Sequence, residues 1–111
     1  MKEYRHVVLS KKAIDHINDA ARDGWRVIAY SGRNILGSSL MYDVIFERDL
    51  DSSKSTDITV EYIIVNTKGS IVEKINEYTL KGYKLVSFSN ITAFGSTLLN
   101  HLVFERTVKI L

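Results

Sequence analysis

The sequence has no cysteine and no proline, no long apolar run and almost no net charge. Without cysteine, the chain cannot form disulfides, thiolate metal sites or a cysteine nucleophile. No apolar run approaches the ~20 residues that cross a bilayer, and no signal-peptide pattern opens the chain, so we expect a soluble, cytoplasmic protein. The 15 Lys and Arg against 13 Asp and Glu give a charge of +2, which is too balanced for a non-specific nucleic-acid binder.

The chain contains an internal repeat. Lys2–Leu50 aligns without a gap on Val60–Val108, 58 residues further on, and 13 of the 49 pairs are identical, where chance gives roughly three. The matching stretches are Glu3-Tyr4 with Glu61-Tyr62, Ile17-Asn18 with Ile75-Asn76, Gly24 with Gly82, Ser31 with Ser89, Gly37-Ser38 with Gly95-Ser96, and Phe46-Glu47-Arg48 with Phe104-Glu105-Arg106. We therefore divide the chain into a first repeat (1–50), a polar linker (51–59) and a second repeat (60–111). Units of ~50 residues are small, so the two are expected to share one core.

The hydrophobic periods change in the same order in both repeats, from strand to helix to two strands. The expected strands are Glu3–Leu9, Trp25–Ser31 and Ser39–Arg48, then Val60–Thr67, Tyr83–Ser89 and Thr97–Arg106. The expected helices carry apolar stripes at Ala13, Ile14, Ile17, Ala20 and Ala21, and at Ile71, Val72, Ile75, Tyr78 and Thr79. Ser10 and Ser70 are predicted N-caps, the latter in a capping box with Glu73, and Gly24 and Gly82 are predicted to end the helices.

These elements predict an α+β fold. Two tandem βαββ repeats would form one compact pseudo-twofold domain, with mostly antiparallel sheet and two helices packed on it. A right-handed crossover places each helix over one face of its sheet, and the third strand of each repeat can lie between the first two.

The residues that carry enzyme chemistry are scarce. His6, His16 and His101 share no metal-ligand spacing, and the chain has no nucleophile elbow, P-loop or dinucleotide fingerprint. We therefore expect no catalytic residues, no metal site and no cofactor. His101 occupies the position that Asp43 holds in the first repeat, which indicates either a contact between the repeats or a structural accommodation.

The repeated Phe-Glu-Arg has two interpretations. Strand alternation places Phe46 and Arg48 on one face and Glu47 on the other, and the second copy does the same. The arginines could form cross-strand ion pairs with exposed charges. Alternatively, Arg48 and Arg106 could offer one guanidinium per repeat to a phosphate or carboxylate.

Two expected hairpin loops, 30–39 and 88–97, are rich in rings, amides, hydroxyls and glycine. They suit a small polar ligand, although Ser, Gly and Asn also belong in ordinary turns. Four apolar residues of these loops are expected to be exposed and to need a cover, which predicts a homo-oligomer, a dimer or higher: Ile35, Leu36, Ile91 and Phe94. The candidate ligand-binding residues are Phe88, Asn90, Phe94, Gly95, Ser96, Thr97 and Arg106, with Arg26 and Arg33.

Each repeat resembles a family of small bacterial and phage proteins of unknown function. The unit of that family opens on Glu-Tyr-x-x-Val, continues through a short helix to Gly-Trp-x-Val or Leu, and closes on Phe-x-Arg. The matching residues are Glu3, Tyr4, Val7, Gly24, Trp25, Val27, Phe46 and Arg48, then Glu61, Tyr62, Val65, Gly82, Leu85, Phe104 and Arg106. The second repeat departs from the pattern with Tyr83 in place of Trp.

A doubled small domain of this size also resembles the phage anti-Thoeris proteins, which are oligomeric sponges for cyclic ADP-ribose-type immune signals. That resemblance implies a non-enzymatic binder of a cyclic nucleotide-type signal in the host-cell cytoplasm. The residues themselves predict that the second repeat matters more for binding than the first, because its loop lacks the bulky Arg33, Phe94 could stack on a base and Arg106 could contact phosphates. The alternative from another class is a structural or protein-interaction module, and a nucleic-acid binder is disfavoured by the charge balance.

Overall fold

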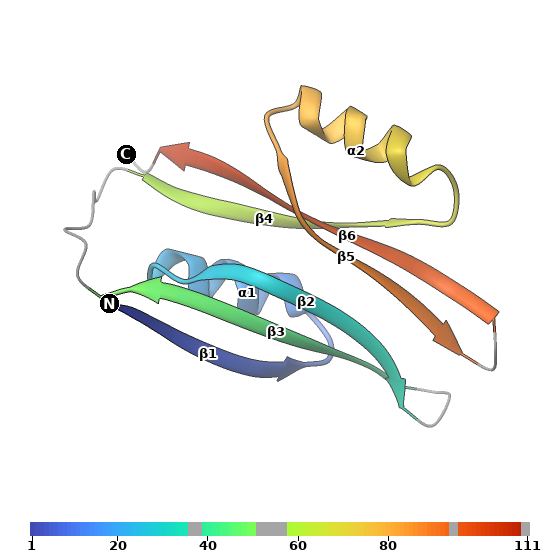
Figure 1. Cartoon of the computed structure of the whole chain (residues 1–111), viewed down its shortest axis with the longest axis horizontal. Helices are drawn as coiled ribbons and strands as arrows, with labels where there is room; N and C mark the ends of the chain where they lie inside the picture. Colours follow the sequence, from blue (N-terminus) through green and yellow to red (C-terminus); the bar gives the residue numbers. More distant parts are fainter. Residues whose placement is uncertain (36–38, 51–57, 94–95, 110–111) are drawn as a thin grey trace.

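The computed structural model describes residues 1–35, 39–50, 58–93 and 96–109, and these contain one order of elements twice (Figure 1). The first repeat consists of β1 (Lys2–Leu9), α1 (Ala13–Arg22), β2 (Arg26–Ile35) and β3 (Ser39–Asp49). The second consists of β4 (Ile58–Thr67), α2 (Ile71–Leu80), β5 (Lys84–Ala93) and β6 (Ser96–Lys109). The predicted α+β class and the β-α-β-β order are therefore confirmed.

Each repeat forms a three-stranded sheet in which the third strand lies in the middle. The orders are β1-β3-β2 and β4-β6-β5, and every neighbouring pair is antiparallel. The registers also match, since Tyr4 faces Glu47 in the first sheet and Tyr62 faces Glu105 in the second. The outer strands β1, β2, β4 and β5 each have one edge without a strand of the same sheet.

The helix ends were predicted with mixed success. Ser70 is the N-cap of α2 and its side chain accepts a hydrogen bond from the N–H of Glu73, as predicted. Gly24 and Gly82 follow the two helices with φ of 94° and 92°, a conformation that favours glycine. The prediction for Ser10 is wrong, because α1 begins after Lys12, which has a φ of 58° and gives no side-chain cap.

The long hairpin loops were also predicted wrongly. β2 continues to Ile35 and β5 to Ala93, so the polar residues after Ser31 and Ser89 extend the ladders with β3 and β6. Ser, Gly and Asn are common in turns, but here the pairing with a long middle strand overrides that preference. Ile91, expected to be exposed, is 1% exposed.

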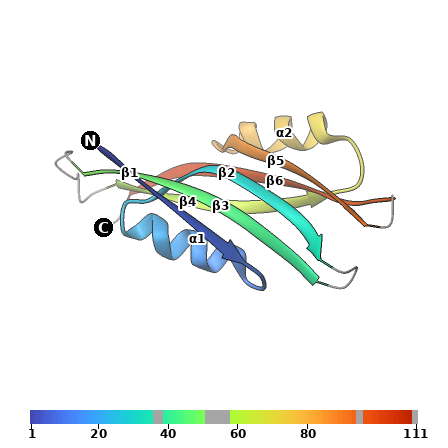
Figure 2. The same cartoon turned by 60° about the horizontal axis from the view of Figure 1, so that its bottom comes forward.

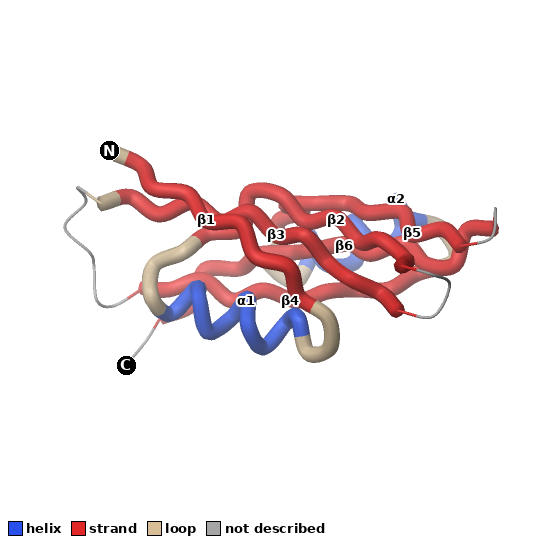
Figure 3. Tube along the Cα trace, turned by 90° about the horizontal axis from the view of Figure 1, so that it is seen from below, coloured by secondary structure: helices blue, strands red, loops and turns tan. Residues whose placement is uncertain are grey.

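The main core lies between the repeats and contains residues of both. α1 contacts β4, and β2 contacts β5, so the first helix fills the space between its own sheet and the second one (Figures 1 and 3). The buried cluster is Ile17, Ala21, Trp25, Val27, Tyr30, Val44, Phe46, Val60, Tyr62 and Val103. Three residues of the predicted α1 stripe, Ala13, Ile17 and Ala21, are buried.

The second helix is covered far less. No residue of α2 is buried, although Tyr78 stacks on Phe104 with ring centroids 5.1 Å apart. α2 lies on the side of its own sheet that faces away from the first repeat, far from β1 (Figures 1 and 2). The structure thus does not confirm the predicted twofold relation, which would place α2 on β1 as α1 lies on β4.

None of the described helices is long and apolar enough to cross a membrane.

Candidate functional site

The closing arginine of the first repeat belongs to a contact between three motif residues. Arg48 Nε donates to Glu3 Oε1 at 2.9 Å, and the guanidinium carbon lies 4.4 Å from the centroid of the Trp25 ring. A guanidinium over an indole is a favourable cation–π contact. The residues of Glu-Tyr, Gly-Trp and Phe-x-Arg therefore meet in space.

The second repeat contains the same contact with tyrosine in place of tryptophan. Arg106 Nε donates to Glu61 Oε1 at 3.0 Å, and its guanidinium lies 4.5 Å from the Tyr83 centroid. Both arginines thus have a carboxylate and a ring as partners within their own repeat. Of the two interpretations of Phe-Glu-Arg, this geometry favours the structural one.

The other predicted ligand-binding residues are dispersed. Phe88 is 48% exposed on β5, and Asn90 Nδ2 donates to Asn100 Oδ1 at 2.7 Å. Arg26 lies 3.4 Å from Glu105, and Arg33 Nε donates to Asp43 Oδ2 at 2.9 Å. Ser96 and Thr97 begin β6, where their backbones pair with Ala93 and Thr92. Phe94 and Gly95 lie outside the described residues.

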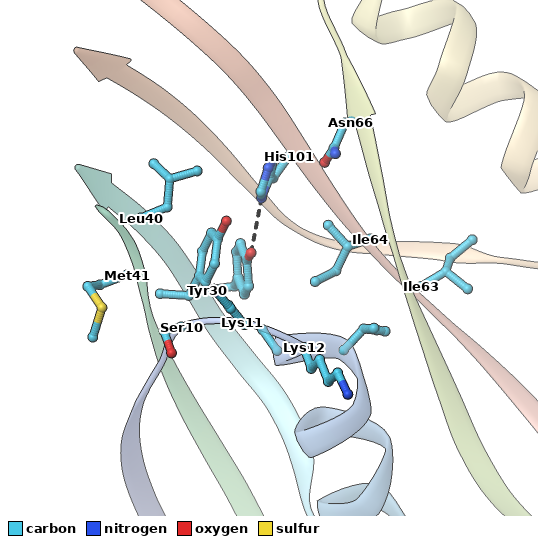
Figure 4. A pocket seen from close by; sticks show the side chains of 13 residues that line it. Ser10, Lys11, Lys12, Tyr30, Leu40, Met41, Ile63, Ile64, Asn66 and His101 are labelled. Atoms are coloured by element: carbon cyan, nitrogen blue, oxygen red, sulfur yellow. Dashed lines mark hydrogen bonds between the residues drawn. The ribbon is translucent and has the colours of Figure 1, made fainter. Parts of the chain in front are cut away.

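The described residues line an open cavity of about 950 Å³ between the start of α1 and the two sheets (Figure 4). This volume lies in the range of small-molecule sites. The first repeat contributes Ser10, Lys11, Lys12, Ala13, Ile14, Tyr30, Leu40, Met41 and Tyr42, and the second contributes Ile63, Ile64, Asn66 and His101. Of the predicted ligand-binding residues that the structure describes, none is among these lining residues.

Three rings form an aromatic cluster on the cavity wall: Tyr30, Tyr42 and His101. The Tyr30 and Tyr42 rings are stacked at 5.4 Å, and the Tyr42 and His101 rings at 5.5 Å. Tyr30 and His101 are buried, whereas Tyr42 is half-buried. A flat ligand ring could therefore reach Tyr42 and stack on a face that the other two rings hold in place.

His101 forms a hydrogen bond with Tyr30 through one ring nitrogen. The Tyr30 hydroxyl lies 3.0 Å from Nδ1, which links the two repeats as the exchange of Asp43 for His101 suggested (Figure 4). Burial lowers the pKa of His101 and raises the pKa of Tyr30. At neutral pH the imidazole is thus neutral, and its tautomer decides whether Nδ1 accepts from the Tyr30 hydroxyl or donates to it, while Nε2 is buried. That atom has no hydrogen-bond partner among the described residues.

The start of α1 gives the cavity a cationic side. Lys11 and Lys12 are exposed and lie with Ser10 next to the first turn of the helix, across the cavity from His101 and Asn66 (Figure 4). A helix N-terminus carries partial positive charge from its N–H groups, which adds to the two ammonium groups. An anionic group of a ligand would be stabilised there.

The sequence placed Tyr30 at the end of an expected strand and the start of an expected loop, and it did not single out Lys11, Lys12 or Tyr42. A usable signal was the set of positions where the two repeats differ in chemistry. Tyr42 aligns with Asn100, and His101 with Asp43, and both differences meet at this cavity. Lys11 and Lys12 align with Gly69 and Ser70, so the second repeat has no such cationic pair.

Within the described part of the chain, no group of three or more His, Asp or Glu side chains is placed to hold a metal ion. Comparisons of the whole chain with models of protein families, with curated proteins and with solved structures give no match.

Proposed function

We propose that this protein binds, without altering it, a small ligand of the cyclic nucleotide type in the cavity between its two repeats. The observation that carries the proposal is the aromatic cluster of Tyr30, Tyr42 and His101 opposite the lysines of the α1 start. A nucleotide combines a flat base with phosphate groups, so it matches both sides of the cavity at once.

The base would stack on Tyr42. Stacking of a base on an aromatic side chain contributes roughly 1–3 kcal/mol and requires no particular base edge. The exposed amide of Asn66, which faces His101 across the strands, offers a donor and an acceptor on the same wall. These groups support recognition of a ring that carries acceptor atoms.

The phosphates would lie at the start of α1. Charge-assisted hydrogen bonds from Lys11 and Lys12 contribute on the order of 1.5–3 kcal/mol each when they are formed to a desolvated anion. Together with the stacking on Tyr42, these hydrogen bonds would make the affinity depend on both the base and the phosphate groups of the ligand.

The most concrete ligand is a cyclic ADP-ribose isomer, which the resemblance to the anti-Thoeris sponges implies. In that role the protein would sequester an immune signal, and a phage would use it to counter Thoeris-type defence. A sponge needs a preorganised cavity and no reacting group, and the rings and ammonium groups described above suit that requirement.

The test is calorimetric titration of the full chain with cyclic ADP-ribose and its glycosidic isomers. We expect binding, and Tyr42→Ala or Lys12→Ala should weaken it about ten- to a hundredfold. The matched controls are Phe88→Ala and Lys109→Ala, an exposed ring and an exposed lysine away from the cavity. Heat denaturation of the complex followed by chromatography should return the ligand unchanged. An altered ligand would indicate an enzyme, and no uptake of any isomer would remove the proposal.

The alternative is a protein-interaction module. It is supported by a different observation, the uncovered face of α2, where Val72 is 65% exposed. Capture of a stoichiometric protein partner together with a ligand-free cavity would favour this alternative.

A further inference from the structure

The first repeat covers the free edge of β4 with a side-chain amide. Asn18 Nδ2 donates to the carbonyl of Tyr62 at 3.1 Å, and the N–H of Tyr62 donates to Asn18 Oδ1 at 2.8 Å. Both main-chain groups of Tyr62 point away from β6, because residues of an antiparallel strand alternate between facing the partner strand and facing outward. The amide thus replaces a neighbouring strand at this position.

Further hydrogen bonds join the first repeat to other residues of the second sheet, on β4, β6 and β5. The Tyr62 hydroxyl accepts from the N–H of Val27 at 2.9 Å and donates to Glu105 at 2.6 Å. Arg26 lies 3.4 Å from the other oxygen of Glu105. The N–H of Gly32 donates to Ser89 Oγ at 2.8 Å.

The 58-residue repeat places matching residues on two surfaces that this chain leaves uncovered. Four residues of the first repeat in this contact, Asn18, Arg26, Tyr30 and Gly32, correspond to Asn76, Lys84, Phe88 and Asn90, which we term the helix surface. Four residues of the second repeat in this contact, Tyr62, Ser89, Glu105 and the core residue Val103, correspond to Tyr4, Ser31, Glu47 and Ile45, which we term the sheet surface. Four of these eight residues are identical to their counterparts, and Arg26 is replaced by another cation, Lys84; the identical four are Asn18, Tyr62, Ser89 and Glu105.

Residues of the contact between the repeats are buried, whereas their counterparts on the helix surface and the sheet surface are exposed. Tyr30 is 3% exposed and Tyr62 1%, whereas their counterparts Phe88 and Tyr4 are 48% and 60% exposed. Ile45 is 38% exposed, while its counterpart Val103 is fully buried. The helix surface and the sheet surface lie on opposite sides of the molecule (Figures 1 and 2).

We infer that the helix surface of one copy of this chain docks on the sheet surface of a second copy, repeating the contact that joins the two repeats. Asn76 would pair with the main chain of Tyr4, whose register opposite Glu47 turns its N–H and C=O to the free edge of β1. The Tyr4 hydroxyl would donate to Glu47, and Lys84 would approach the same carboxylate. Because the two surfaces differ, the contact runs head to tail.

The docking partner is a second copy of this chain, because each copy carries both the helix surface and the sheet surface that complements it. The internal contact demonstrates that a helix surface of this composition fits a sheet surface of this composition. The repeats have kept identical residues at Asn76, Tyr4 and Glu47, which a solvated surface would not require. The interface proposed here is independent of the ligand proposed above.

The test is sedimentation of the full chain and of two single-surface variants at micromolar concentration. The unaltered protein should have a mass of at least twice the 12.6 kDa of one chain. Phe88→Lys removes the helix surface and Tyr4→Lys removes the sheet surface, so each variant should sediment as a single chain. A 1:1 mixture retains one intact surface of each kind and should form a dimer of twice 12.6 kDa and nothing larger.

The matched control is Leu80→Lys, because Leu80 is 90% exposed on α2 but corresponds to Arg22, which is itself exposed on α1. It should leave the mass unchanged. Asn76→Ala, which introduces no charge, should raise the dissociation constant about fivefold or more. Unchanged circular dichroism would show that each variant is folded. A single-chain mass for the unaltered protein, variants that keep its mass, or a mixture that stays single-chain would each overturn the inference.

Discussion

The side chain of Ile91 in β5 occupies the space that a side chain at Gly32 in β2 would need. A Cβ atom added to Gly32 would lie 2.7 Å from Ile91 Cγ1 and 3.3 Å from a ring carbon of Tyr42. Ile91 is 1% exposed, so it has little room to move. The two outer strands approach each other closely because one of them lacks a side chain here.

Gly32→Ala should therefore lower the free energy of unfolding by about 1–3 kcal/mol, the usual effect of overpacking a well-packed site. Urea unfolding measures it. The matched control is Gly69→Ala, where an added Cβ meets nothing within 4 Å, and the change should be small. Ile91→Val should recover part of the loss in a double mutant. Equal effects at the two glycines would show that the close approach of β2 and β5 is not what requires glycine.

Tyr62→Phe should destabilise the protein by about 1–3 kcal/mol, because it leaves the N–H of Val27 and the carboxylate of Glu105 without their shared partner. Thermal and urea unfolding should agree on this loss. The control is Tyr83→Phe, whose hydroxyl donates to Glu61 over 3.4 Å in a more exposed setting. Its effect should be smaller, and a larger one would contradict the central role of the Tyr62 hydroxyl.

The repeat made most of the fold predictable from the sequence. Agreement of the two copies predicted the element order and the two glycines after the helices, and the capping box of the second copy predicted the Ser70 cap. The copies could not reveal how one packs on the other, because the apolar stripe of α1 has three buried residues and the corresponding stripe of α2 has none. Burial there depends on a neighbour that only one helix has within this chain.

The candidate site was harder to predict for a related reason. The rings of Tyr30, Tyr42 and His101 come from three strands of both sheets and meet only through the packing of the repeats. Local patterns predicted a site in the hairpin loops, whereas strand pairing extends through Asn34 and Thr92. Whether Phe94 and Gly95 contribute to binding stays a prediction, as they lie outside the described residues.

The stability should fall as the pH is lowered from about 7 to about 5. Burial holds the pKa of His101 below its ordinary value of 6.5, so the unfolded chain takes up a proton before the folded one does. The contribution of the neutral imidazole is complete above pH 6.5 and is lost as the pH falls through the lowered pKa. Asp43, whose pKa is lowered by hydrogen bonds from His6 and Arg33, acts in the same direction only below about pH 4.

Urea midpoints across this range measure the effect. His101→Asn should flatten the pH dependence between 7 and 5, and His16→Ala, at an exposed position on α1, should leave it unchanged. A slope that survives in His101→Asn would assign the effect to another group. The phenols on either side, Tyr30 and Tyr42, have raised pKa values and stay neutral throughout this range.

Arg106→Ala should lower stability and leave ligand uptake within about twofold. Its guanidinium is held by Glu61 and the Tyr83 ring, and it does not line the cavity. Loss of a partly exposed ion pair and a cation–π contact should reduce the free energy of unfolding by about 1–2 kcal/mol. Arg48→Ala, which disrupts the equivalent contact with Glu3 and Trp25, should have a similar effect.

Arg106→Lys distinguishes the contribution of the positive charge from that of the planar guanidinium. A lysine keeps the positive charge but cannot stack a planar group on Tyr83 while donating twice to Glu61, so part of the stability should remain lost. If the arginine instead served a phosphate, Arg106→Ala would weaken ligand uptake tenfold or more, while Tyr42→Ala would have little effect. That outcome would move the binding site from the cavity to the end of the second repeat, where the sequence alone predicts it.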